Sequence, residues 1–483
     1  MKKLTLITLL VLLSSNVFAE VITLQQAVDY ALKNNNKIKQ YNSKLEEKKY
    51  SEYEAYGNYL PKFDLVSSYT HLDNPLMIDL NPIRDAMITM QSANQVEFAN
   101  IYNIMKGNPA LSDAQRSILQ TQFNQQLNQL LPPFEETLKQ QDYKTATIVG
   151  VQPIFMGGKI IAGSKFASAD KHLSEVELKQ IKDEVTREVT KKYLTVLLIS
   201  DIIKVRKDVI ELVTKHLERA TKLMKEGLIA NFNVLRAEVA LAEAEKNLSE
   251  DENNLDLALL SLKNEMGMDL NQDISVEGEL TFNEFSENLS ELLTIAKENN
   301  VILQQIEQRK LQAEQKHIAD RAAFLPTLAA FGKYELYPNY LSALEPKWAV
   351  GLSLNFNVFN GLKDYSKYQS SAALIQEVNY LQKDVEGKIE LLVNKNYKDV
   401  MNSKDRYFKN QKNISLAAEN LRLNEKRFES SLGTSLEVID ANVSYEKTLI
   451  DSKKYLYDYY CSLTDLFNTI GKTNDVVQII NNK

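Results

Sequence analysis

The sequence of 483 residues repeats itself, and this repeat limits the possible folds more than any other feature. From about residue 155 to 267 the chain matches, without a gap, a segment 204 residues further on. The matching residues are Phe155, Gly157 and Lys159 with Phe359, Gly361 and Lys363, and then Val234, Leu235 and Ala237 with Val438, Ile439 and Ala441. An internal repeat marks a structural unit used more than once, so we expect two similar halves.

The beginning of each half matches at a different offset, of 265 residues. Leu60-Pro61 recurs as Leu325-Pro326, and Ala31, Asn34 and Asn35 recur as Ala296, Asn299 and Asn300. The two offsets differ by 61 residues, which predicts an insertion in the first half, at 73–144. The predicted organisation is a first repeat at 20–267, a linker at 268–288, a second repeat at 289–471 and a tail at 472–483.

Residues that break helices are scarce, since the chain has only 15 glycines and 10 prolines. This scarcity leaves room for very long helices. Charged residues make up 25% of the chain, which is too many for a polytopic helical membrane protein. The net charge of −7 argues against a nucleic-acid partner, which would require a basic surface.

Each half contains two predicted strands, at about 62–72 and 145–156 and at about 327–336 and 347–359. In the last strand large apolar residues alternate with small or polar ones; the apolar residues are Trp348, Val350, Leu352, Leu354, Phe356 and Val358. This alternation suits an outer-membrane barrel strand with these residues facing lipid, and it also suits a half-buried strand of a soluble sandwich. Four strands cannot close a barrel, and open edges are not tolerated in lipid, so a barrel would need several chains.

Helices account for most of the rest. Each half begins with a helical stretch, at about 23–57 and 289–322, and each continues after its strands into a helical hairpin, at 160–267 and 362–471. The first arm of each hairpin lacks proline over about 67 residues, which gives a rod of roughly 100 Å. Its apolar residues recur every three or four positions, as in a coiled-coil seam. We expect Asn231 and Ser435 to cap the returning helices.

The first 19 residues have the pattern of a cleaved export signal. A basic start at Lys2 and Lys3 precedes an apolar core, and the segment ends at Val17-Phe18-Ala19. The apolar core is too short to span a bilayer. The sequence therefore predicts an exported protein.

With these motifs in view, the chain resembles the TolC family of outer-membrane efflux proteins. The resemblance rests on the doubled Leu-Pro strand entries, the Phe-x-Gly-x-Lys strand exits and the two hairpin tips, Gly227-Leu-Ile-Ala and Thr434-Ser-Leu-Glu-Val-Ile-Asp-Ala. It implies a mainly α protein with a transmembrane β portion. Three chains would contribute four strands each to a twelve-stranded barrel, and their helices would form a periplasmic α-barrel.

The resemblance also gives the tips a role, because in this family they form the periplasmic mouth and meet an adaptor protein. The matching residues are Gly227, Leu228, Ile229, Ala230, Leu432, Gly433 and Thr434. One departure is that Ser431 stands where the first half has Gly227, so the second tip could differ in its backbone.

Some family members carry two aspartates after the second tip, at the closed entrance. The matching residues are Glu437 and Asp440, whose spacing of three puts both carboxylates on one helix face. In a trimer they would form a ring of six carboxylates that binds cations and repels anions. Alternatively, an acidic residue at this position is favoured simply by the helix dipole.

The insertion has helical spacing at 84–106 and 111–131 and is predicted to form a helical cap on the outer side of the membrane. We find no catalytic motif, and we expect no metal and no cofactor. The predicted function is an outer-membrane exit duct of a tripartite efflux pump or a type I secretion system, with an adaptor and an inner-membrane transporter as partners. The alternative is a periplasmic coiled-coil structural or adaptor protein.

Overall fold

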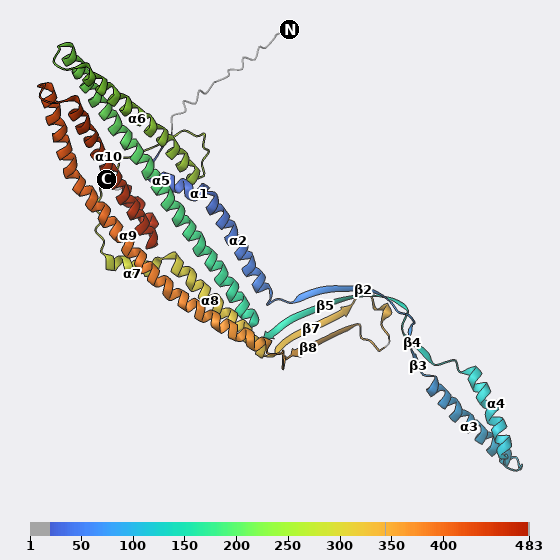
Figure 1. Cartoon of the computed structure of the whole chain (residues 1–483). Coiled ribbons are helices and arrows are strands. Elements are labelled where there is room, and N and C mark those ends of the chain that lie inside the picture. The colour runs from blue at the N-terminus through green and yellow to red at the C-terminus, as the bar shows by residue number, and fades with distance from the viewer. Residues whose placement is uncertain (1–19, 343, 482–483) are drawn as a thin grey trace, which may run out of the picture. The chain divides into compact units, whose positions relative to one another are not determined.

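The computed structural model describes residues 20–342 and 344–481, which are mainly helical (Figure 1). They form two compact units. The helical unit contains the described residues up to Ala55, together with Ile161–Asp320 and the residues from Tyr365 onward. The sheet unit contains Tyr56–Ile160 and Arg321–Asp364, so each unit draws on both repeats. The predicted export signal, residues 1–19, lies outside the described residues.

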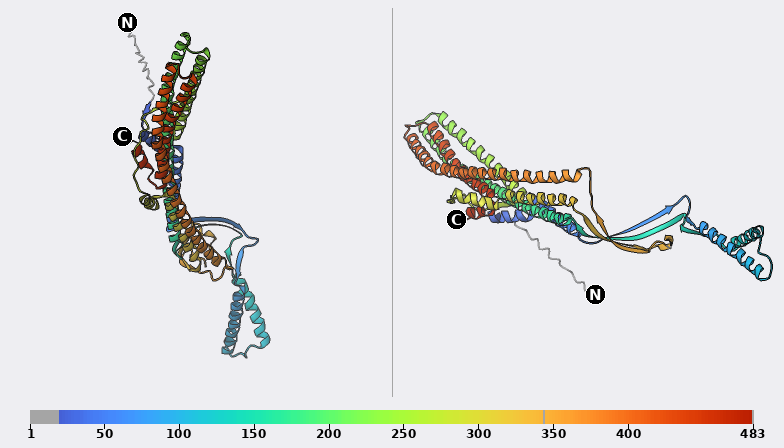
Figure 2. Two further views of the ribbon diagram at one scale, coloured as in Figure 1. Left: turned by 60° about the vertical axis from the view of Figure 1, so that its left-hand side comes forward. Right: turned by 90° about the horizontal axis from the view of Figure 1, so that it is seen from below.

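The helical unit contains two long helical hairpins, as predicted. In Figures 1 and 2 their arms run along a common direction. The helices are α1 (Leu24–Asn34), α2 (Asn36–Gly57), α5 (Lys159–Lys225), α6 (Asn231–Met266), α7 (Leu289–Asn299), α8 (Val301–Arg321), α9 (Lys363–Glu429), α10 (Ser435–Thr469) and α11 (Thr473–Asn481). The first arms, α5 and α9, both have 67 residues and begin at matching lysines. Helix α11 lies in the segment that was expected to be only a tail.

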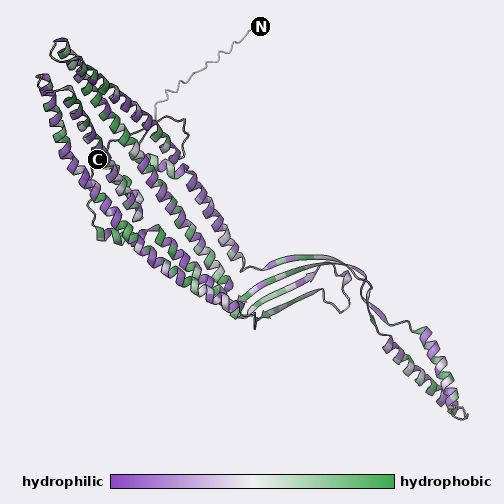
Figure 3. Cartoon of the chain, in the orientation of Figure 1, coloured by the Kyte–Doolittle hydropathy of each residue, from purple (hydrophilic) through white to green (hydrophobic). Residues whose placement is uncertain are grey.

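The predicted seams are the centre of the core. Figure 3 shows hydrophobic residues recurring among polar ones along the helices. On α5 the buried seam residues include Val185, Val189 and Tyr193, and on α9 they include Val393 and Val400. Burying such side chains contributes roughly 1.5–3 kcal/mol each relative to full exposure, so these seams carry much of the packing energy.

The helical stretches expected at 23–57 and 289–322 are each broken into two helices, which corrects the prediction. The breaks lie at Asn35 and Asn300, whose backbones are extended. The Asn35 amide donates to the carbonyl of Glu265 (2.7 Å), and the Asn300 amide donates to the carbonyl of Thr469 (2.8 Å). Since residues 265 and 469 are themselves 204 apart, the repeat extends to these tertiary contacts. Each asparagine side chain also accepts from a backbone N–H at the start of the following helix.

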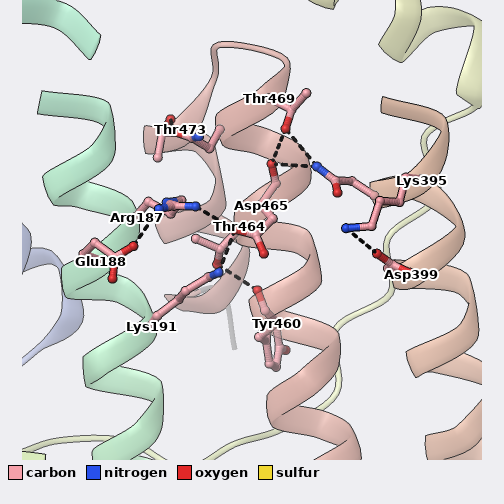
Figure 4. Close-up of polar contacts among 12 residues, drawn as sticks. Arg187, Glu188, Lys191, Lys395, Asp399, Tyr460, Thr464, Asp465, Thr469 and Thr473 are labelled. Carbon is pink, nitrogen blue, oxygen red and sulfur yellow. Dashed lines mark hydrogen bonds and ion pairs between the residues drawn. The ribbon is translucent and has the colours of Figure 1, made fainter. Parts of the chain in front are cut away.

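Polar contacts join the C-terminal end of α10 to the middle of α5 and of α9 (Figure 4). The Asp465 carboxylate of α10 lies 2.7 Å from Lys191 and 3.3 Å from Arg187, both on α5. From α9, the Asn396 amide donates to the Thr469 hydroxyl (2.8 Å). Helix α10 is therefore bonded to the first arms of both repeats.

A short parallel pair of strands joins the start of the chain to the inter-repeat linker. It consists of β1 (Glu20–Ile22) and β6 (Ile274–Val276). The Tyr193 hydroxyl donates to the carbonyls of Ile22 and Glu277, which fixes this pair against α5. Strands of three residues are too short to give a periodic signal, so the sequence predicted only a linker here.

The sheet unit contains one antiparallel sheet in the order β2-β5-β7-β8. Its strands are β2 (Lys62–His71), β5 (Asp142–Met156), β7 (Thr327–Glu335) and β8 (Trp348–Asn355), with short 3-10 turns η1 (Ala322–Phe324) and η2 (Pro338–Tyr340). The predicted strands are thus all present.

The insertion follows β2 and returns to β5. It begins and ends in a two-stranded antiparallel ribbon, β3 (Leu76–Asp79) with β4 (Glu135–Lys139), that was not predicted. Between these strands lies the predicted pair of helices, α3 (Asn81–Met105) and α4 (Asp113–Leu130).

Candidate functional site

The first hairpin tip is a tight turn between α5 and α6. Gly227 has a positive φ of 76°, and its N–H donates to the carbonyl of Met224 (2.9 Å). The N–H of Leu228 donates to the carbonyl of Leu223 (3.0 Å). These two bonds satisfy carbonyls at the helix end, as in a Schellman turn. The returning helix is capped by Ala230, whose backbone is extended, and not by Asn231 as expected.

The second tip has the same backbone. Ser431 has a positive φ of 56°, and its N–H donates to Phe428 (3.0 Å), while Leu432 donates to Arg427 (2.8 Å). These bonds match those of the first tip at the offset of 204, so the serine does not change the turn. Gly433 lies in a crowded place instead, because an added Cβ would lie 3.1 Å from the Arg427 side chain and 3.2 Å from Glu437.

The second tip is capped by Thr434, which corrects the prediction of Ser435. The Thr434 hydroxyl accepts from the N–H of Glu437 (3.3 Å), and the Glu437 carboxylate accepts from the N–H of Thr434 (2.7 Å). This is a capping box. Ser435, the first helical residue, is fully buried and contributes to the contact between the tips.

His216 is the residue that connects the two tips. Its Nε2 lies 2.8 Å from the Ser435 hydroxyl, which donates to the carbonyl of Asn233 (3.2 Å). The imidazole also packs on Phe428, with ring centroids 4.7 Å apart. Thus α5, α6, α9 and α10 meet at one buried polar group.

Sequence reasoning missed His216. The only available signal was its position on the apolar stripe of α5, where Val209, Val213, Ala220 and Leu223 are buried. A histidine on such a stripe indicates a buried polar contact, but it does not identify the partner.

A mostly aliphatic groove of about 570 Å³ lies close to the tips, between α5, α6 and α10. Leu235, Val239 and Val443 form exposed parts of its wall. Asn442 is also in the wall, and its amide oxygen has no hydrogen-bond partner among the described residues. The groove is therefore an apolar surface next to both tips.

The two predicted gate residues lie on the exposed side of α10. Glu437 is occupied by its capping contacts and by Arg427, whose Nη1 lies 3.5 Å from the carboxylate. The backbone N–H of Thr434 and the charge of Arg427 lower the pKa of Glu437. Asp440 is exposed and has no partner among the residues that the structure describes. Glu437 lies in the first turn of α10, as the helix-dipole alternative requires, and it also completes the capping box; the gating role of both residues stays a prediction.

The sheet has one strongly apolar face. The register pairs Trp348 with Tyr334, Val350 with Gly332, Leu352 with Ala330 and Leu354 with Leu328. The predicted lipid-facing residues of β8 are 61–74% exposed, so the rest of residues 20–342 and 344–481 leaves this apolar surface uncovered. The opposite face contains polar residues, among them Lys62, Asp64, Lys333, Ser353 and Asn355.

Phe356 and Val358 are not part of the strand, contrary to the prediction. Strand β8 ends at Asn355, which pairs with Thr327, the first residue of β7. The residue before Thr327 is Pro326, which has no N–H and cannot extend the ladder. Phe356 and Val358 nevertheless remain exposed.

Two further observations bear on the type of site. Over residues 20–342 and 344–481, no helix combines the length and the apolar composition needed to cross a membrane. The same residues contain no cluster of three or more His, Cys, Asp or Glu that could hold a metal ion.

Comparison with known structures shows the fold. The chain is similar to the outer membrane protein VceC from Vibrio cholerae, with a TM-score of 0.70 and 15% identity over 93% of this chain and 96% of the other. The Campylobacter jejuni CmeC outer membrane channel matches with a TM-score of 0.69 and 14% identity, over 95% of this chain and 90% of the other. The open state of the Neisseria gonorrhoeae MtrE outer membrane channel matches with a TM-score of 0.67 and 14% identity, over 93% of this chain and 89% of the other. No curated protein matches the chain.

The sequence itself identifies the family. The family model described as outer membrane efflux protein matches residues 119–268 and 292–472, which together are more than half of the chain. The matched segments contain both long hairpins and both tips. The chain therefore belongs to the outer membrane efflux protein family, the TolC family that its motifs resemble, and it is an outer-membrane efflux channel and not an enzyme.

Proposed function

We propose that three copies of this chain form the exit duct of a tripartite efflux pump or a type I secretion system. The observation that carries the proposal is the sheet with one apolar face and two open edges. Within the described chain, β2 and β8 each pair on one side only. Unpaired backbone groups are too costly in lipid, so β8 of one copy must pair with β2 of the next. Three-fold closure then gives twelve strands.

In this proposal the duct conducts passively. The apolar sheet face contacts lipid, and the polar face with Lys333, Asp64 and Ser353 lines a watery lumen. The long helices extend into the periplasm as an α-barrel. An inner-membrane transporter supplies the energy, and substrates enter through the mouth at the helical tips.

The tips are suited to dock a periplasmic adaptor. Leu228 and Leu432 occupy matching positions and are 57% and 76% exposed, so each tip presents an apolar side chain to solvent. Together with Gly227, Ile229, Ala230, Gly433 and Thr434 they form the proposed docking residues. The adjacent aliphatic groove offers a surface for an amphipathic helix of the adaptor.

Glu437 and Asp440 are the proposed gate. Their positions in the first two turns of α10 put them beside the docking residues, so docking can change their spacing. In the trimer, six carboxylates would surround the entrance and attract cations.

The proposed function is tested by the oligomeric state and the membrane location of the protein in the cell. Outer membranes extracted with mild detergent should contain a heat-resistant species with the native mass of three chains. The protein should cofractionate with outer-membrane porins. A monomer in the soluble periplasmic fraction would reject the duct and favour the structural or adaptor class.

A further inference from the structure

Helix α3 of the insertion has a second apolar side that no residue described by the structure covers. Its buried side faces the hairpin partner α4 and includes Ile88 and Val96, which are 3% and 5% exposed. The uncovered side, here called the α3 stripe, consists of Ile83, Met87, Met90, Asn94, Phe98, Ile101 and Met105. Its apolar members are 48–80% exposed. At 100° per residue the stripe spans an arc of about 80° on the face opposite the buried side.

Helices α3 and α4 are held together by contacts that do not involve the α3 stripe. Arg84 donates from Nη2 to the carbonyl of Leu131 (2.7 Å), and the N–H of Leu111 donates to the Asn100 side chain (2.9 Å). Glu97 and Arg116 form an ion pair of 3.3 Å. The stripe is therefore not needed to join α3 to α4.

The spacing of the α3 stripe is that of a helix that packs against other helices. Successive members are 4, 3, 4, 4, 3 and 4 residues apart, which averages about 3.67. This value matches the 11-residue repeat, which gives a right-handed supercoil. A single amide, Asn94, interrupts the apolar residues, and such a group in a seam specifies register and the number of chains.

The absence of charge on the α3 stripe allows a second copy of the same helix to be its partner. The α3 stripe contains no ionisable residue, so packing it against itself brings no like charges together. The charged residues of α3 are Arg84, Asp85 and Glu97; Arg84 pairs with Asp85, and Glu97 pairs with Arg116. The stripe is thus compatible with itself.

The connection to the sheet places α3 beyond the end of β2. The N–H of Leu72 donates to Gln141 (2.8 Å) and that of Leu80 donates to Phe134 (2.8 Å), so bonds between the two chain segments continue from the β2–β5 pair through the β3–β4 ribbon. Helix α3 follows β2, which is an open edge of the sheet. In the proposed trimer, β2 of each copy pairs with β8 of the next, so the three α3 helices leave from the same rim of the barrel.

We propose that the α3 stripes of three copies pack against one another as a helical bundle beyond the sheet, an inference that rests on the proposed trimer. The bundle places an apolar seam between the copies, with the three Asn94 amides in one layer. It adds a second trimer contact, far in sequence from the long helices.

Disulfide cross-linking of the full-length protein tests this bundle. In a Cys461→Ser background, Met90→Cys and Ile101→Cys place a thiol on the α3 stripe, and Gln122→Cys places a matched thiol on the exposed side of α4. All three positions are exposed, so the hairpin should fold in each variant. After oxidation of outer membranes, Met90→Cys and Ile101→Cys should give a two-chain band approaching about two thirds of the protein, the limit for one disulfide per trimer. Gln122→Cys should give little.

Trimer formation is measured separately on the same unoxidised samples. A heat-resistant trimer in which the stripe thiols cross-link no better than Gln122→Cys would overturn the bundle and leave the duct intact. The absence of a trimer would instead overturn the proposed function, and the bundle with it.

Discussion

The imidazole Nε2 of His216 lies 2.8 Å from the hydroxyl oxygen of Ser435, across 219 residues of sequence. Both residues are almost fully buried, at 3% and 0% exposure. Because Ser435 begins α10 and His216 lies near the end of α5, this contact ties the two repeats together at the proposed mouth.

The contact makes the tips sensitive to acid. Burial lowers the pKa of His216 to about 4, and the positive charge of Arg219 acts in the same direction. The unfolded value is about 6.5, so the folded tips favour the neutral ring. The stabilisation is present above pH 6.5 and is lost as the pH falls from 6.5 through 4. Hydrogen exchange at the tips, corrected for intrinsic rates, should therefore show decreasing protection over this range.

Two variants test whether His216 causes the pH dependence of hydrogen exchange at the tips. His216→Asn keeps a hydrogen-bonding side chain that does not titrate, so the pH dependence at the tips should be largely lost. His172→Asn changes an exposed histidine of the same helix and should retain it. Equal pH dependence in His216→Asn and the wild type would show that another group is responsible.

Arg206 should be the strongest ionic contact below the tips. It joins α5 to Asp251 of α6 (2.8 Å) and to Glu446 of α10 (2.5 Å), with all three side chains less than one-fifth exposed. Arg206→Met leaves two partly buried carboxylates unpaired and should cost about 2 kcal/mol.

The neighbouring residue provides a matched control. Lys207 pairs with Glu252 at 3.5 Å, and both side chains are more than half exposed. Lys207→Met should cost no more than about 0.5 kcal/mol. Thermal melting followed by helical circular dichroism should rank the two variants in this order; similar melting temperatures would argue against the three-helix ion pair.

The matching turns predict opposite effects of exchanging their left-handed residues. Ser431 has a side chain at a φ of 56°, a conformation that favours glycine, so Ser431→Gly should stabilise the second tip by about 0.5–1 kcal/mol. Gly227→Ser should destabilise the first tip by about 1 kcal/mol. The amides of Leu432 and Leu228, which donate across the two turns, report the change in hydrogen exchange. Equal effects of the same sign would contradict the equivalence of the turns.

The proposed gate predicts the loss of block by divalent cations. In single-channel recordings, Glu437→Gln combined with Asp440→Asn should remove this block because the carboxylate ring is gone. Glutamine can still complete the capping box, so the tip should keep its structure. Glu429→Gln, which changes a paired acid at the end of α9, is the control and should retain the block. Unchanged block in the double variant would exclude the gate.

The repeat made much of the fold predictable from sequence. The paired positions Asn35 and Asn300 make equivalent contacts, and Gly267 and Gly471 lie with positive φ against Asn34 and Asn299. Long helices without breakers and alternating strands give strong periodic signals. These features were therefore located to within a few residues.

The helix caps and the side-chain contacts at the tips could not be predicted, because they depend on single dihedral angles or on residues distant in sequence. Whether Ala230 or Asn231 caps α6 is decided by the backbone of one residue, which no periodic pattern reports. The side chain of Ser435 was read as a cap, but it is used by His216 and Asn233 from the other repeat. Likewise, no sequence pattern around Glu437 indicates that Arg427 lies beside it.

The contact of the sheet with lipid is tested most directly by fluorescence of Trp348. It is the only tryptophan of the chain, begins β8 on the apolar face and is 61% exposed. In proteoliposomes, lipids brominated near the headgroup should quench its emission strongly, and aqueous iodide should quench it weakly, because aromatic residues sit at the membrane interface. Strong quenching by iodide, with no effect of brominated lipid, would contradict a lipid-facing sheet and the trimeric duct.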